Sequence, residues 1–101
     1  IHPDHLEAHN NLAAMLARSG RPSEAITHFE QAVRLRPDRV ELRMNLAVAY
    51  ASVHNFTEAI ATAEQARDIA RAAGQAELVQ NIETWIANCR DRAQSEAAQG
   101  P

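Results

Sequence analysis

Three short segments of this 101-residue chain occur twice, each time 34 residues apart. The pairs are Asn11-Leu12-Ala13 with Asn45-Leu46-Ala47, Glu24-Ala25-Ile26 with Glu58-Ala59-Ile60, and Glu30-Gln31-Ala32 with Glu64-Gln65-Ala66. A fixed internal period of this length is the signature of a repeat protein, in which each unit is one supersecondary element that stacks on its neighbours. Such stacks present extended surfaces, so the period favours binding over catalysis.

Aligned at this period, both copies resemble the tetratricopeptide repeat (TPR) family, whose unit is a helix-turn-helix. Six of the nine positions that define the family hold the family residue in the first copy, and four do so in the second. The matching residues are Leu12, Gly20, Ala25, Phe29, Ala32 and Pro37, and then Leu46, Tyr50, Ala59 and Ala66. Small residues at fixed spacing are what close helix packing requires.

The resemblance implies an all-α fold, with TPR helix-turn-helix repeats forming a short right-handed superhelix of five helices. We predict these helices at residues 4–18, 22–36, 38–53, 56–73 and 75–95. The predicted units are a repeat at 6–39, a degenerate repeat at 40–73, and a carboxy-terminal capping helix with a frayed tail at 74–101. Residues 1–5 resemble 35–39, so we expect the tail of a truncated repeat there and a chain cut from the carboxy-terminal part of a longer array.

Polar residues and glycines predict where the helices begin and turn. The spacing of a capping box occurs at three helix starts, in Asp4 with Glu7, Asp38 with Glu41, and Asn55 with Glu58. Gly20 and Pro22 suit a tight turn after the first helix. In the second turn His54 and Asn55 replace glycine, and we expect Asn55 to take a positive φ there. Gly74 separates the last two helices.

The last predicted helix carries an apolar stripe at helical spacing, formed by Leu78, Ile82, Trp85, Ile86 and Cys89. A helix without a following partner can bury such a stripe only against the preceding pair. Glu83 stands where the family has Gly or Ala to admit a second helix, and a helix packed there would bury its charge. We therefore expect this helix to cap the array and the residues from Arg90 onward to fray.

Composition excludes several classes of function. The net charge is −3 and the chain has no lysine, so the basic surface that would neutralise a nucleic-acid backbone is missing. No apolar run approaches the roughly 18 residues of a membrane span, so we expect no membrane contact by this segment. A single cysteine, Cys89, cannot form an internal disulfide, which leaves the compartment open, with the cytoplasm slightly favoured.

The resemblance implies that a peptide or a partner protein binds in the concave groove, which the first helix of each repeat lines. The groove positions are Asn10, Asn11, Ala14 and Arg18, then Met44, Asn45, Val48 and Ser52, and on the capping helix Glu77, Gln80, Asn81, Thr84 and Asn88. Asn11, Asn45 and Asn81 would form a ladder of amides, which can grip a peptide backbone because each amide both donates and accepts. Alternatively, these asparagines only join neighbouring helices and keep the groove polar.

Two other binding modes fit less well. Some TPR domains clamp an acidic carboxy terminus with Lys, Asn and Arg, but here Asn10 occupies the Lys position and only Asn45 fits. Four arginines cluster between the repeats, and the acidic residues around them favour a solvated face over an anion site. They are Arg34, Arg36, Arg39 and Arg43. A structural alternative is that these repeats only terminate the array of a larger protein, for which a membrane-anchored bacterial protein is one candidate.

We expect no enzyme, no cofactor and no metal site. His5 and His9 have the i, i+4 spacing of metal ligands on a helix, with His2 before them, but this spacing often arises by chance. His9 stands where the family packs an aromatic residue. Cys89 lies on the apolar stripe, where a buried thiol is unreactive.

The first helix predicts one further property. Without a preceding helix, Leu6, Leu12 and Ala13 would leave an apolar surface bare at the amino-terminal end. Ends of repeat stacks that lack a polar cap tend to find a substitute partner. We therefore expect weak self-association through this end.

Overall fold

The computed structural model describes residues 4–99, except for the side chains of Asp4, His5 and Glu7. Within this range it consists of five α-helices and contains no strand, which confirms the all-α prediction. They are α1 (Asp4–Arg18), α2 (Pro22–Leu35), α3 (Val40–Ser52), α4 (Phe56–Ala72) and α5 (Ala76–Gln99). Most of segment 1–5 and the capping box expected at Asp4 and Glu7 lie outside the description. No described helix combines the length and the apolar character that crossing a membrane would require.

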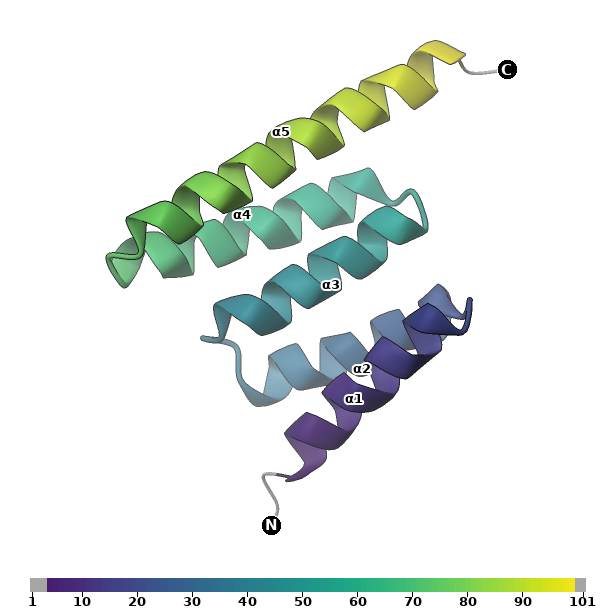
Figure 1. Ribbon diagram of the computed structural model, residues 1–101, viewed down its shortest axis with the longest axis vertical. Coiled ribbons are helices and arrows are strands. Elements are labelled where there is room, and N and C mark those ends of the chain that lie inside the picture. The colour runs from purple at the N-terminus through teal and green to yellow at the C-terminus, as the bar shows by residue number, and fades with distance from the viewer. Residues whose placement is uncertain (1–3, 100–101) are drawn as a thin grey trace.

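Each helix packs on the next one along the chain, which produces an elongated two-layer stack of 49 × 35 × 17 Å. In Figure 1, α1, α3 and α5 lie nearer the viewer, and α2 and α4 lie behind them. Since α1 and α3 both pack extensively on α2, they are joined mainly through α2 and not by close contact with each other. The front helices therefore leave space between them.

Alanines occupy the closest contacts between helices. Eight of them are completely buried, which lets neighbouring backbones approach closely. These residues are Ala13 on α1, Ala25 and Ala32 on α2, Ala47 on α3, and Ala59, Ala63, Ala66 and Ala70 on α4. Larger side chains fill the spaces around them, with Phe29 and Leu46 between α2 and α3 and Ile82 and Ile86 between α5 and α4. Ala13 was expected on the bare amino-terminal surface, and that expectation is wrong because it packs against α2.

Three of the turns between helices contain a residue with positive φ, and two of these residues, Gly20 and His54, are at equivalent repeat positions. Gly20 has a φ of 77° and Gly74 one of 74°. In the second turn His54, 34 residues after Gly20, adopts a φ of 63°, whereas Asn55 has a φ of −89°. The prediction of a positive φ at Asn55 is therefore wrong, because its side chain caps α4 and accepts a hydrogen bond of 3.4 Å from the Glu58 amide.

The capping box predicted at Asp38 and Glu41 is also wrong. Helix α3 begins at Val40, two residues later than predicted, and its cap residue Arg39 makes no side-chain capping bond. Arg39 instead donates to the Glu41 carboxylate at 3.2 and 3.3 Å, and this hydrogen bond lowers the pKa of Glu41. Arg43 donates to the Pro37 carbonyl at 2.9 Å, which holds the turn before α3 in place.

Helix α5 extends to Gln99, so the prediction of a frayed end from Arg90 is wrong. The turn between α3 and α4 holds this extension. The Arg92 guanidinium lies 5.2 Å from the centroid of the Phe56 ring, and the His54 imidazole contacts the Glu96 carboxylate at 2.6 Å. The predicted stripe is confirmed, since Ile82, Ile86 and Cys89 are buried and Leu78 and Trp85 are partly buried.

Candidate functional site

Asn45 in the middle of α3 connects the front helices. Its Nδ2 donates a hydrogen bond of 3.2 Å to Oδ1 of Asn10 on α1. An amide side chain offers two donor hydrogens and an acceptor oxygen. This bond uses one donor of Asn45, and its Oδ1 makes no hydrogen bond to any described residue. The Asn45 amide therefore retains the capacity to bind a peptide backbone.

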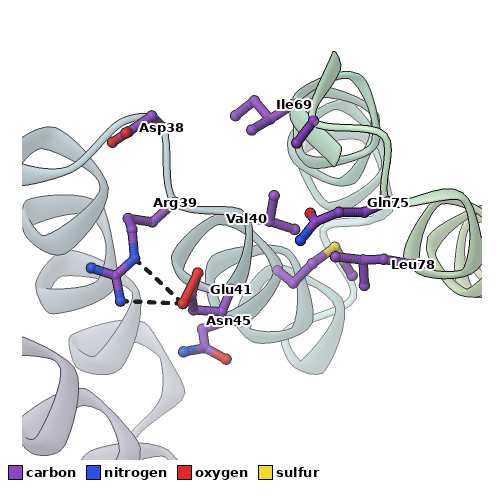
Figure 2. A pocket seen from close by; sticks show the side chains of 10 residues that line it. Asp38, Arg39, Val40, Glu41, Asn45, Ile69, Gln75 and Leu78 are labelled. Atoms are coloured by element: carbon purple, nitrogen blue, oxygen red, sulfur yellow. Dashed lines mark hydrogen bonds and ion pairs between the residues drawn. The ribbon is translucent and has the colours of Figure 1, made fainter. Parts of the chain in front are cut away.

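One hollow lies beside Asn45 where α3 begins, α4 ends and α5 begins, with a volume of about 590 Å³ (Figure 2). Its apolar lining consists of Val40, Met44, Ile69, Ala73 and Leu78. Its polar lining consists of Asp38, Arg39, Glu41, Asn45 and Gln75. We call this space the α3–α5 hollow. Arg39 and Glu41 are paired with each other, which leaves the Asp38 carboxylate as the remaining charge of this lining.

A second hollow lies between α1 and α3, over the start of α2, with a volume of about 320 Å³. It is lined by Ala17, Gly20, Pro22, Phe29, Asn45, Val48, Ala49 and Ser52. We call it the α1–α3 hollow. Val48 is 49% exposed here, although it lies mid-helix, because α1 does not pack closely on α3. Both hollows are mainly apolar, and Asn45 lines both.

The four groove positions predicted on the second repeat all line these hollows. Met44 lies in the α3–α5 hollow, Val48 and Ser52 lie in the α1–α3 hollow, and Asn45 lies between them. The Ser52 hydroxyl donates to the Ala49 carbonyl at 2.7 Å, so its hydrogen is used within the helix.

The positions predicted on the first repeat are less uniform. Asn10 bonds to Asn45, whereas the repeat equivalent Asn11 is exposed and lies with Asn10 at a small hollow near Arg39. Equivalent residues on successive front helices point in the same direction, so they do not face each other. Ala14 is half-buried and Arg18 is exposed. The Asn10–Asn45 bond also fits the alternative in which the asparagines join neighbouring helices.

On α5 the sequence alignment selected different residues from those that line the α3–α5 hollow. Gln80 lines a separate hollow beside Arg71 and Glu83, between α4 and α5. Asn81 and Thr84 are exposed, and Thr84 donates to the Gln80 carbonyl at 3.0 Å. Gln75 and Leu78 are the residues of this segment that line the α3–α5 hollow.

Sequence reasoning also missed Ile69 and Ala73, which line the α3–α5 hollow from the end of α4. The family comparison assigns the groove to the first helix of each repeat, so it could not indicate residues of a second helix. A signal was present for Leu78, which is the first member of the apolar stripe.

The cysteine and the arginine cluster considered in the sequence are held by contacts within the fold. Cys89 is buried among Ala51, Phe56 and Ala59, and burial raises the pKa of its thiol, which keeps it in the unreactive form. The arginine cluster is partly paired, since Arg39 binds Glu41 and Arg43 donates to Gln65 at 2.6 Å. This pairing fits a solvated face.

Two proteins of known function are similar in sequence to part of this chain. The chain is 39% identical over 59 residues to the peroxisomal targeting signal receptor of Eremothecium gossypii, and 44% identical over 50 residues to that of Saccharomyces cerevisiae. These matches cover 58% and 50% of the chain, but only 10% and 8% of the two receptors. The chain thus spans no more than about a tenth of these relatives.

Two solved structures have the same fold. A tetratricopeptide repeat domain protein from Salinibacter ruber superposes with a TM-score of 0.76 at 22% identity, covering 88% of this chain and 90% of that one. The N-terminal domain of stress-induced protein-1 from C. elegans superposes with a TM-score of 0.77 at 21% identity, covering 95% of this chain and 78% of that domain.

The family is established by the profile described as "Tetratricopeptide repeat", which matches residues 16–82 and so includes most of both repeats and the start of α5. The five-helix stack and the solved structures agree with it. The chain belongs to the tetratricopeptide repeat family, whose stacked helices are scaffolds for binding other proteins.

Proposed function

We propose that this chain binds an extended segment of a partner protein across α3, with Asn45 holding the backbone and the two flanking hollows receiving apolar side chains. The observation that carries this proposal is the position of Asn45, which lines both hollows and keeps an unused carbonyl oxygen. A backbone amide of the partner would donate to this oxygen.

The geometry of an extended peptide suits such a site. Successive side chains of an extended chain point to opposite sides, so residues two apart point the same way. Two such side chains can enter the α3–α5 hollow and the α1–α3 hollow while the backbone between them faces Asn45. The lining of both hollows is mainly apolar, which favours apolar side chains of the size of Val, Leu or Met.

The relatives support a protein segment as the class of ligand. Two of them are named as receptors of a peroxisomal targeting signal. Because the chain matches only about a tenth of each, the similarity concerns the repeat scaffold and leaves the bound sequence to experiment.

A peptide library displayed against the purified chain tests the proposal. We expect saturable binding that Asn45→Ala weakens about tenfold, as for the loss of one buried hydrogen bond of about 1.4 kcal/mol. Val48→Asp should weaken binding further by placing a charge in the α1–α3 hollow. Gln94→Ala removes an exposed amide near the end of α5 and serves as the matched control. Binding that all three variants retain would place the ligand elsewhere.

The alternative function is a purely structural cap that terminates a longer array in a larger protein, for which a membrane-anchored bacterial protein is one candidate. The exposed polar residues of α5 favour it, since Gln80, Glu83 and Asp91 leave no apolar face for a following helix. A library without any binder would favour this alternative, particularly if deleting α5 exposed the apolar core to a hydrophobic dye.

A further inference from the structure

His9 on α1 and His28 on α2 face each other across the first helix pair. Their Nδ1 atoms lie 3.2 Å apart, their ring centroids are 5.4 Å apart, and the ring planes are inclined by 31°. Both side chains are half-buried. The sequence did not indicate this pair, because His9 and His28 are 19 residues apart and lie on different helices. The spacing of the histidines instead suggested His5 and His2 as neighbours of His9.

We propose that His9 and His28 together bind a divalent transition-metal ion through their Nδ1 atoms. Imidazole nitrogen is a preferred ligand of zinc, copper and nickel. In a tetrahedral zinc site the two nitrogens lie about 2.0 to 2.1 Å from the metal and therefore about 3.3 Å from each other. The observed separation of 3.2 Å needs almost no movement of either helix to accept the ion.

Metal binding would replace the hydrogen bond between the two rings. That bond requires one Nδ1 atom to donate and the other to accept. For both Nδ1 atoms to bind the metal ion, the Nδ1 proton of the donating ring must leave that nitrogen, and water accepts it.

The protein supplies two ligands from its described side chains. No group of three or more His, Cys, Asp or Glu residues in that part of the chain could surround one ion. Water therefore completes the coordination, and the bound ion joins α1 to α2. A ligand that binds only the folded state raises the melting temperature, so the site would stabilise the first helix pair.

Titration of the metal-free full chain with Zn²⁺ tests the proposal, with ¹⁵N-detected imidazole spectra as the readout. We expect the Nδ1 resonances of His9 and His28 to shift together at saturation while those of His54 stay in place. His28→Asn and His9→Asn should each lower the affinity at least tenfold and remove the rise in melting temperature. His54→Asn, at an exposed histidine on another turn, is the matched control and should bind as the parent does.

Two results would overturn the proposal. One is an unchanged Zn²⁺ affinity in His28→Asn. The other is Zn²⁺ binding by the unmodified chain that leaves the His9 and His28 resonances in place and is lost in a His2→Asn, His5→Asn double variant. Helical circular dichroism without metal shows whether each variant folds. If His28→Asn does not fold, the imidazole spectra of the unmodified chain still decide the question, because they require no substitution.

Discussion

The Tyr50 hydroxyl on α3 donates a hydrogen bond of 2.6 Å to the Glu30 carboxylate on α2. This bond joins the two repeats at the interface where Phe29 and Leu46 pack, and Tyr50 itself packs against that cluster. Burial, and then the bond and the negative charge of Glu30, raise the pKa of Tyr50 to about 12. The phenol therefore remains a donor well beyond the ordinary range of tyrosine.

The pKa of Tyr50 can be measured directly, because it is the only tyrosine in the chain. We expect phenolate absorbance of the folded protein to rise with a midpoint near pH 12, against about 10 in urea. Since the folded pKa is raised, the stabilising contribution is complete below about pH 10 and is lost as pH rises through 12. A folded-state midpoint near 10 would contradict this prediction.

Removing the hydroxyl should weaken the connection between the repeats. Tyr50→Phe keeps the ring and loses the hydrogen bond, so we expect the free energy of unfolding in urea at pH 7 to fall by about 1 kcal/mol. Glu30→Gln is the partner variant. In a double-mutant cycle the two changes should be non-additive, and strict additivity would show that the bond contributes nothing.

Large side chains of α5 test whether this helix holds the stack together. Ile86 is 2% exposed and Trp85 is only partly buried, so burial favours Ile86 as the more sensitive site. We expect Ile86→Ala to lower the free energy of unfolding by about 3 to 4 kcal/mol and Trp85→Ala by about 2 to 4 kcal/mol. A domain of this size has only about 5 to 10 kcal/mol in total, so either variant should melt at a much lower temperature. Changes of a few degrees would show that α5 does not support the repeats.

Substitutions at Gly20 measure the free-energy cost of a positive φ without any steric clash of the new side chain. Its φ is 77°, and a Cβ built there would meet no atom within 4 Å. Gly20→Ala should therefore destabilise through backbone strain alone, by about 1 kcal/mol in urea unfolding. Gly20→Asn should cost less, because asparagine tolerates the left-handed region better. Equal stability of the parent, Gly20→Ala and Gly20→Asn would contradict the left-handed conformation of residue 20.

The period predicted the fold well because small residues at fixed spacing permit only one stacking. Ala25 and its repeat equivalent Ala59 are both completely buried. The residue with positive φ in the second turn is His54, the repeat equivalent of Gly20, although the neighbouring Asn55 has the stronger intrinsic preference for the left-handed region. Local preference failed there because the tertiary arrangement of α3 and α4 decides the conformation.

The site was only partly predictable for a related reason. Repeat equivalence finds residues that point in the same direction, such as Asn11 and Asn45, but it does not identify side chains that face each other. Asn10, His28 and Ile69 reach their partners across helices, and such contacts depend on crossing geometry that a single sequence does not specify. The extension of α5 to Gln99 was missed because contacts of Arg92 and Glu96 with the second turn overcome its polar composition.

The exposed face of α1 carries the last prediction. Leu12 is 41% exposed and Met15 is 57% exposed, whereas their repeat equivalents Leu46 and Ala49 are 7% and 5% exposed. Helix α2 covers the equivalents through the cluster that contains Phe29. The corresponding face of α1 is apolar and uncovered among the described residues, so we expect weak self-association through it.

Sedimentation over a wide concentration range should therefore show a rising average mass as the protein approaches millimolar concentration. Met15→Glu should abolish the rise without loss of stability, because the side chain is exposed and a charge placed there opposes burial in an interface. Leu35→Glu is the matched control, at an exposed leucine on the far end of α2, and it should associate as the parent does. A strictly monomeric parent would refute this role for α1, and loss of association in both variants would indicate nonspecific apolar attraction.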